Sequence, residues 1–235
     1  MKNLIISIID YSLMKENIPS LDETRKCLSG MNADYVDLKL SDFKTNESVF
    51  EKLSNLQCTM KYDFVLLYYF GKGITYHDER AFKFKDDEFP IELNRVINLL
   101  GNDHTSVAIM MVCGFAQWTS SSKSNKKEIW VDDPPWENGT IISRLVRTEE
   151  TPIKFTPTYT NHNNYSIGLL ADLKCGIGAD VKLSENFIKI LKNRNFSSFN
   201  DFWLQYGYSL KEFNRIHPST WNPGVCNKKF MGLFR

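Results

Sequence analysis

Two residues able to do chemistry follow apolar segments of the chain. Cys113 closes the run SVAIMMVC over 106–113, and Lys72, flanked by glycines, follows the run YDFVLLYYF over 62–70. Runs this apolar are typical of central strands that are covered on both faces of a parallel sheet. Sites in open α/β sheets form at the carboxyl ends of the strands, so we expect Cys113 and Lys72 to lie side by side.

The chemistry that such a position would serve is nucleophilic catalysis, in which a base takes the proton of the thiol. Histidine is the usual base, whereas Lys72 is protonated at neutral pH and has no lone pair to accept a proton. Between two glycines it is expected to be a solvated turn residue. Cys113 has an equally simple alternative, which is packing as a small hydrophobic side chain.

Two histidines are expected near this edge of the sheet, His77 and His104. Each is expected to be an ordinary surface residue. His77 lies along a predicted hairpin after Lys72, and it would reach Cys113 only if that loop folded back.

The elements that must position these residues alternate between strand and helix. Strands are expected over 4–9, 34–40, 62–70, 106–113, 165–171 and, at the end of the chain, 229–234. Helices are expected over 20–29, 48–56, 90–100, 184–193 and 198–216, with a hairpin over 74–87. This alternation predicts an α/β fold with a central, mostly parallel, six-stranded sheet and helices on both faces.

The segment over 118–164 differs in composition from the rest. It is rich in Ser, Lys, Asp, Pro, Thr and Asn, which predicts a long and largely irregular connection. The chain is therefore expected to be a single domain over 1–235. In it, 118–164 joins an amino-terminal part, 1–117, to a carboxyl-terminal part, 165–235.

Composition narrows the possible partners. The chain has 235 residues, 42 % of them hydrophobic, which is enough for a full core. With 29 basic and 28 acidic residues the net charge is +1, so neither nucleic acid nor an anionic membrane is an expected partner. Five cysteines without a CxxC pattern predict reduced thiols, no metal and no cofactor. No signal peptide or membrane span is recognised, and a cytoplasmic location is expected.

The order of these elements resembles the caspases, cysteine proteases that cut after aspartate. A caspase strand ends in Ser-His-Gly, and FGKG over 70–73 holds that place; the next ends in Gln-Ala-Cys-Arg-Gly, and MVCGF over 111–115 holds that one. Segments 166–171, 185–188 and 222–230 resemble parts of the small subunit. The resemblance covers nearly the whole chain and implies a caspase-like sandwich, with 1–117 similar to the large subunit and 165–235 to the small one.

The resemblance assigns roles to three positions. Cys113 stands at the nucleophile, Lys72 at the catalytic histidine and Gly73 at the oxyanion hole, where backbone amides stabilise developing charge. The arginines that hold the substrate aspartate in caspases are missing, since the corresponding segments read KENIP over 15–19 and GADVK over 178–182. Glu16 and Asp180 in these segments would repel an acidic substrate.

These departures predict a catalytically inactive caspase homologue. It would regulate apoptosis or a related pathway by dimerising with an active caspase, by sequestering it, or by pairing with itself. In caspases the corresponding terminal strand pairs across the dimer, which here predicts an interface formed by Phe230, Met231, Leu233 and Phe234.

Two alternatives remain open. One is an active caspase-fold cysteine peptidase of altered specificity that uses Cys113 with Lys72 or His77. The other is an unrelated doubly wound domain in which 71–73 forms a phosphate loop, although the chain lacks the GxxxxGK[ST] spacing.

Overall fold

The structure is a computed structural model of the chain. It describes residues 1–10, 19–76, 79–84, 90–102, 104–119, 127–129, 165–172, 181–199, 201–202, 205–206, 216–221 and 227–234. Within these ranges, residues 19–20, 57–60, 72–76, 79–80, 83, 111–119, 127–129, 165–172, 181–186, 216–221 and 227–228 are described by their backbone alone.

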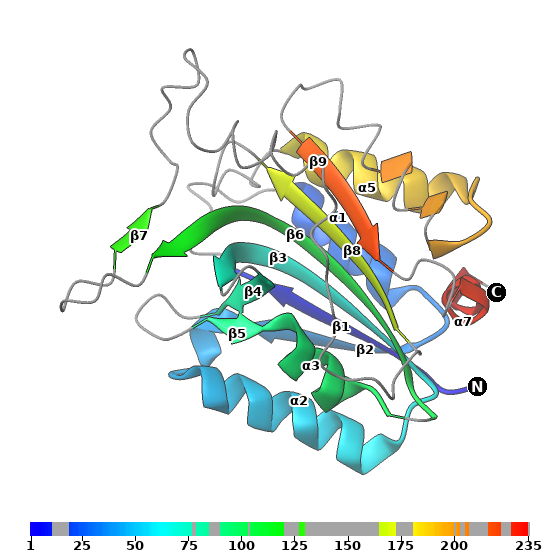
Figure 1. Cartoon of the computed structure of the whole chain (residues 1–235). Helices are drawn as coiled ribbons and strands as arrows, with labels where there is room; N and C mark the ends of the chain where they lie inside the picture. Colours follow the sequence, from blue (N-terminus) through cyan, green and yellow to red (C-terminus); the bar gives the residue numbers. More distant parts are fainter. Residues whose placement is uncertain are drawn as a thin grey trace.

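A twisted sheet forms the centre of the molecule (Figure 1). Its main strands, in the order β2-β1-β3-β6-β8-β9, are Asp34–Lys39, Asn3–Ile9, Phe64–Tyr76, Ser106–Thr119, Tyr165–Asp172 and Ile216–Trp221. Neighbours in this order pair in parallel except β9, which is antiparallel to β8. The short strands β4 (Glu79–Lys83), β5 (Ile91–Glu92) and β7 (Lys127–Ile129) extend the sheet beyond the six expected strands, to nine in the described residues.

Helices cover both faces of this sheet (Figure 1). Helices α1 (Pro19–Ser29) and α5 (Val181–Asn193) lie on one face, and α2 (Asn46–Met60) and α3 (Leu93–Leu100) lie on the other. The short helix α7 (Asn227–Met231) and the 3-10 turn η4 (Gly232–Phe234) end the described chain, and a further 3-10 turn, η2 (Leu40–Asp42), follows β2. The predicted α/β class with a parallel sheet flanked by helices is confirmed.

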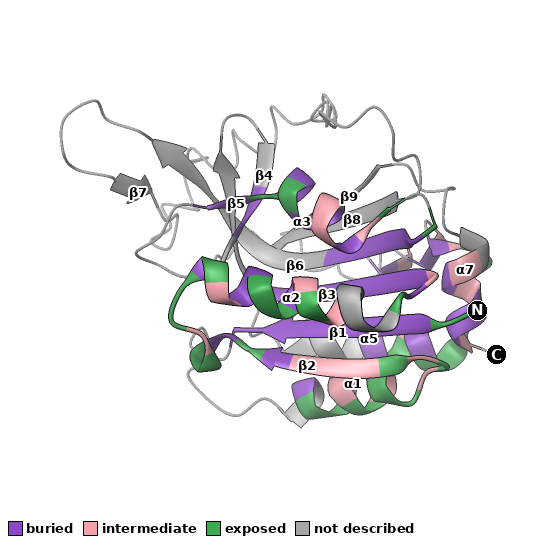
Figure 2. Cartoon of the chain, turned by 90° about the horizontal axis from the view of Figure 1, so that it is seen from below, coloured by how far each residue is buried: buried purple, intermediate pink, exposed green. Residues whose placement is uncertain are grey.

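Alternate residues of the central strands enter two separate hydrophobic clusters. In β1, Ile6 and Ile8 pack in the cluster that includes α2 and α3, whereas Ile5 and Ile9 pack in the cluster that includes α1 and α5. All of β1 is buried, as Figure 2 shows. Burial on both faces is why these strands are continuously apolar rather than alternating.

The terminal segment is helical, so the strand predicted over 229–234 is wrong. Phe230 lies in α7 and is fully buried, and Leu233 in η4 is 1 % exposed. Both side chains pack in the cluster that includes α1 and α5. Apolar residues at 230, 233 and 234 suit a helical turn, and this packing decides against an edge strand.

The strand at this edge of the sheet is β9 instead. It begins at Ile216, where the sequence predicted the end of a helix over 198–216; described positions of that helix at 199, 201–202 and 205–206 are helical. Two helices also start elsewhere: α3 begins after β5 rather than at Pro90, and α5 begins at Val181 rather than Ser184. No helix in the described ranges has the length and apolar character needed to cross a membrane.

The segment predicted to be irregular, 118–164, begins in regular structure. Strand β6 continues to Thr119, and β7 pairs antiparallel with its last residues. Residues 120–126 and 130–164 lie outside the described part of the chain.

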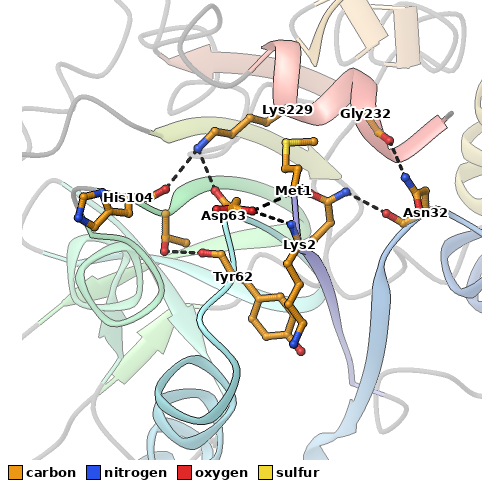
Figure 3. Close-up of polar contacts among 10 residues, drawn as sticks. Met1, Lys2, Asn32, Tyr62, Asp63, His104, Lys229 and Gly232 are labelled. Carbon is orange, nitrogen blue, oxygen red and sulfur yellow. Dashed lines mark hydrogen bonds and ion pairs between the residues drawn. The ribbon is translucent and has the colours of Figure 1, made fainter.

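Polar contacts tie the carboxyl-terminal helix to the amino end of the sheet (Figure 3). The Nζ of Lys229 donates to the carbonyl oxygens of Asp63, at 3.0 Å, and His104, at 3.3 Å. The Asp63 carboxylate accepts the backbone N–H of Lys2 at 2.6 Å and lies 3.9 Å from the amino group of Met1. These contacts fix α7 beside the starts of β3 and β6.

Candidate functional site

Strands β3 and β6 bring the two predicted site positions together, as expected. Their parallel register pairs Gly71 with Cys113 and Lys72 with Gly114. Cys113 and Lys72 are thus on neighbouring strands, one register position apart. Consecutive positions of a strand belong to opposite faces of a sheet, so the register does not favour a direct Cys113–Lys72 pair.

Lys72 lies in a strand and not in a turn, so the predicted turn at this position is wrong. Strand β3 continues to Tyr76, and Lys72 is paired with Lys83 of β4 on one side and Gly114 of β6 on the other. Antiparallel pairing with β4 keeps the chain extended past the glycines. The predicted turn at Lys72 is therefore an interior position of the sheet.

Gly73, the predicted oxyanion-hole position, is also inside the sheet. It pairs with Phe82 of β4 and with Phe115 of β6, and Cys113 likewise lies between Gly71 and Ala171. Backbone amides between two paired strands face a ladder on either side. An oxyanion hole at Gly73 and Cys113 stays a prediction, and it would require amides released from this ladder.

An aromatic side chain covers the sheet next to the Cys113 position. A Cβ added at Gly71 would lie 2.6 Å from the hydroxyl oxygen and 2.7 Å from Cζ of Tyr69. Tyr69 is fully buried and packs edge-on against Phe82 and Phe84, with ring centroids 5.0 and 5.6 Å away. Only glycine at position 71 leaves room for this ring.

The substitution Gly71→Ala is expected to destabilise the protein by about 1–3 kcal/mol, because the new methyl group overpacks the core against Tyr69. Urea denaturation of both proteins measures the loss. Adding Tyr69→Phe removes the nearest of the clashing atoms, so the double variant should lose less than the sum of the two single losses. Strict additivity would show that Tyr69 does not lie over Gly71.

A further residue that sequence reasoning missed, His217, is in register with Cys113. Cys113 pairs with Ala171 of β8, and Ala171 pairs with His217 of β9, so these positions form one row across three strands. Two strand spacings put the Cα atoms of Cys113 and His217 about 10 Å apart. The available signal was that the chain has only four histidines, but the strand that carries His217 was not predicted.

The two histidines that were considered do not support a rescued pair. His104 precedes β6 at the amino end of the sheet, beside Lys229 (Figure 3). Cys113 lies far along that strand. Nine residues of strand separate His104 from Cys113 by about 30 Å. The expectation that His104 lies near the Cys113 edge is therefore wrong, and His77 lies outside the described residues.

Of the two segments that would bind substrate in caspases, 15–19 and 178–182, the structure describes Pro19, Val181 and Lys182. Glu16 and Asp180 lie outside the described residues, and Lys182 lies in the first turn of α5. The arginine of α1, Arg25, forms an ion pair with Asp37. Arg25 thus has an internal partner in the fold.

That ion pair belongs to a polar network between α1 and the sheet. The fully buried Ser7 hydroxyl donates to the Asp37 carboxylate at 2.7 Å and accepts from the Tyr35 hydroxyl at 3.0 Å. Each group has a partner, so the network is explained by the stability of the fold.

One cysteine has a described side chain, and it does not suggest a reactive site. Cys27 of α1 is half-buried and free, and burial raises the pKa of its thiol, opposed by the nearby Lys192. A raised pKa reduces the thiolate fraction at neutral pH. In the described part of the chain no group of three His, Cys, Asp or Glu side chains is placed to hold a metal ion.

Solved structures of two other proteins are similar to this chain. The Drosophila initiator caspase Dronc is similar with a TM-score of 0.53 and 8 % identity, over 95 % of this chain and 79 % of that one. The fold is caspase-like. A protein from Geobacter sulfurreducens, GSU0716, is similar to this caspase-like fold with a TM-score of 0.52 and 12 % identity, over 94 % of this chain and 93 % of that one.

Comparison of sequences does not identify a family for this chain. No family model matches the chain, and no curated protein matches it. At identities of 8 % and 12 % the structural likeness extends to the fold and not to residue roles. The roles of Cys113, Lys72 and Gly73 therefore remain predictions.

Proposed function

We propose that the chain is a catalytically inactive, caspase-like protein that acts by binding. In this proposal it has the sandwich architecture of the caspases and regulates apoptosis or a related pathway by pairing with an active caspase or with itself. The caspase-like fold supports the class of protein. The absence of an imidazole at position 72 and of arginines in both clamp segments supports inactivity.

The observation that carries the proposal is the register of β3 and β6. Lys72 is one position out of the Cys113 row and is paired on both sides within the sheet. A protonated ammonium group cannot accept the proton of a thiol. The position that resembles the caspase histidine thus supports neither the geometry nor the proton transfer of the reaction.

The proposed binding surface is the edge strand β9. In the described part of the chain β9 pairs with β8 alone, which leaves its other side able to accept a partner strand. Pro218 lies in this strand opposite Leu170. Proline occurs in sheets where its missing N–H would point away from the neighbouring strand. Residues 216, 218 and 220 therefore direct their backbone groups outward, and residues 217 and 219 direct theirs to β8.

Two proline variants separate pairing at this edge from folding. Thr220→Pro removes an outward donor and should weaken self-association or caspase binding about tenfold while circular dichroism stays unchanged. Ser219→Pro removes a donor to β8 and should disturb the fold instead. Sedimentation velocity, with and without a caspase whose active-site thiol has been alkylated, measures the association.

Association that survives Thr220→Pro would show that β9 is not the interface. A chain that stays monomeric and binds no caspase at micromolar concentrations would contradict the proposal as a whole.

A second candidate function is an active cysteine peptidase of altered specificity. The observation that favours it is His217, which shares a register row with Cys113 and is separated from it by Ala171. Of the partners first considered, Lys72 is out of that row and His77 lies outside the described residues. In this candidate, His217 would take the thiol proton through one bridging water.

A further inference from the structure

The register of the sheet places Cys113 on the same face as a buried tyrosine of the neighbouring strand. Cys113 is an interior position of the sheet, paired with Gly71 of β3 and Ala171 of β8. Alternate residues of a strand share a face, and residues directly opposite each other on neighbouring strands share it too. Tyr69 packs in the cluster that includes α2 and α3. Gly71, two residues later, and Cys113, opposite Gly71, therefore belong to the face of Tyr69.

The ring of Tyr69 occupies the space next to the Cys113 position. Gly71 has no side chain, and the hydroxyl oxygen and Cε2 of Tyr69 lie 2.6 and 3.0 Å from the place that its Cβ would take. Neighbouring strands are about 4.8 Å apart, so the Cys113 position is one strand spacing from the space that the ring fills. A reagent or substrate that approached Cys113 over β3 would have to displace this ring.

Aromatic partners from β4 hold the ring of Tyr69 in place. Tyr69 is fully buried and packs edge-on against Phe82 and Phe84, with ring centroids 5.0 and 5.6 Å away. Phe82 and Phe84 stack on each other at 5.2 Å, and Phe82 is paired with Gly73 of β3. A ring wedged between aromatic partners in a close-packed core has little freedom to swing aside.

We propose that Tyr69 is an internal cover that keeps the Cys113 thiol unreactive. A cysteine reacts as its thiolate and only where a reagent can reach it, and apolar surroundings disfavour the thiolate. The inference rests on the proposed inactivity of the chain and gives it a cause that is independent of Lys72. Supplying a base would not open the position at which the nucleophile stands.

The test is alkylation of the whole chain by iodoacetamide, followed by mass spectrometry of the peptide that contains Cys113, because the chain has five cysteines. In the natural chain Cys113 should react at least about a hundredfold more slowly than in the urea-denatured chain. Tyr69→Leu keeps an apolar side chain that is too short to cover Gly71, and it should accelerate the reaction at least about tenfold. Tyr69→Phe keeps the ring and should leave the rate unchanged.

The matched control is Tyr68→Leu, the same change at the next residue of β3. Tyr68 is also fully buried, but it packs in the cluster that includes α1 and α5, on the opposite face. If Tyr69→Leu acted only by loosening the fold, Tyr68→Leu would accelerate the alkylation of Cys113 as much. We expect a change of less than about threefold for Tyr68→Leu.

The proposed cover is overturned if Cys113 of the natural chain reacts as fast as in urea, a comparison that needs no variant to fold. It is also overturned if Tyr69→Leu causes no acceleration, or no more than Tyr68→Leu does. Fast alkylation of Cys113 without peptide turnover would overturn the cover alone and leave the proposed function standing. Peptide turnover that depends on Cys113 would contradict the proposed function itself.

Discussion

Replacing Phe230 with alanine is expected to lower the free energy of unfolding by about 3–5 kcal/mol, the usual cost of removing a buried phenylalanine ring. The ring is fully buried. Its centroid lies 5.2 Å from that of Phe199, 5.7 Å from that of Phe202 and 5.4 Å from that of Phe234. The substitution therefore opens a cavity in an aromatic cluster that joins the end of the chain to the sheet.

Urea denaturation followed by tryptophan fluorescence measures this loss. Met231→Ala, at a half-buried position of the same helix, is the matched control and should cost about 1 kcal/mol. A loss below about 1 kcal/mol for Phe230→Ala would mean that the ring does not lie in the core. The interpretation of 229–234 as an exposed edge strand would then regain support.

The central strands were predictable because both of their faces are buried. The apolar runs over 4–9, 62–70 and 106–113 became β1, β3 and β6, and helix α1 ends at Ser29, as its sequence indicated. Such runs have few other folds available to them. Their parallel order followed from the helices between them.

The carboxyl ends of β3 and β6 show the limit of prediction from local sequence pattern. Both strands continue past the glycines, to Tyr76 and Thr119, because β4 and β7 pair with them from other parts of the chain. Glycine and lysine at 71–73 are typical of a turn when they are considered alone. Pairing with distant strands overrides that preference.

The last third of the chain was harder for a similar reason. Ile216–Trp221 has little strand character apart from its place beside β8, and proline inside it argues against a strand. The apolar end of the chain has a spacing that suits either a strand or a helical turn. Packing against Phe196 and Phe199 decides for the helix.

The candidate site was predictable as a pair of neighbouring strands and not as a geometry. Which residues share a face depends on register to a single position, and sequence does not give that register. This is why Lys72 falls out of the Cys113 row and why His217 enters it.

Peptide hydrolysis by this chain is expected to be absent, and restoring histidine at position 72 should not create it. Lys72→His supplies an imidazole, but it leaves the register one position away from Cys113. It also leaves both segments that resemble the caspase substrate clamp without arginine. General base catalysis contributes only when the base lies within hydrogen-bond reach of the proton.

The most direct measurement is the turnover of fluorogenic peptides by the purified chain, with aspartate and then other residues at the scissile position. Cys113→Ala is the control for thiol-dependent cleavage. If the protein is catalytically inactive, neither the natural chain nor Lys72→His should turn over these peptides faster than Cys113→Ala does. Turnover that Cys113→Ala abolishes would contradict the proposed function, and its further loss in His217→Gln would identify the chain as a peptidase that uses the Cys113–His217 row.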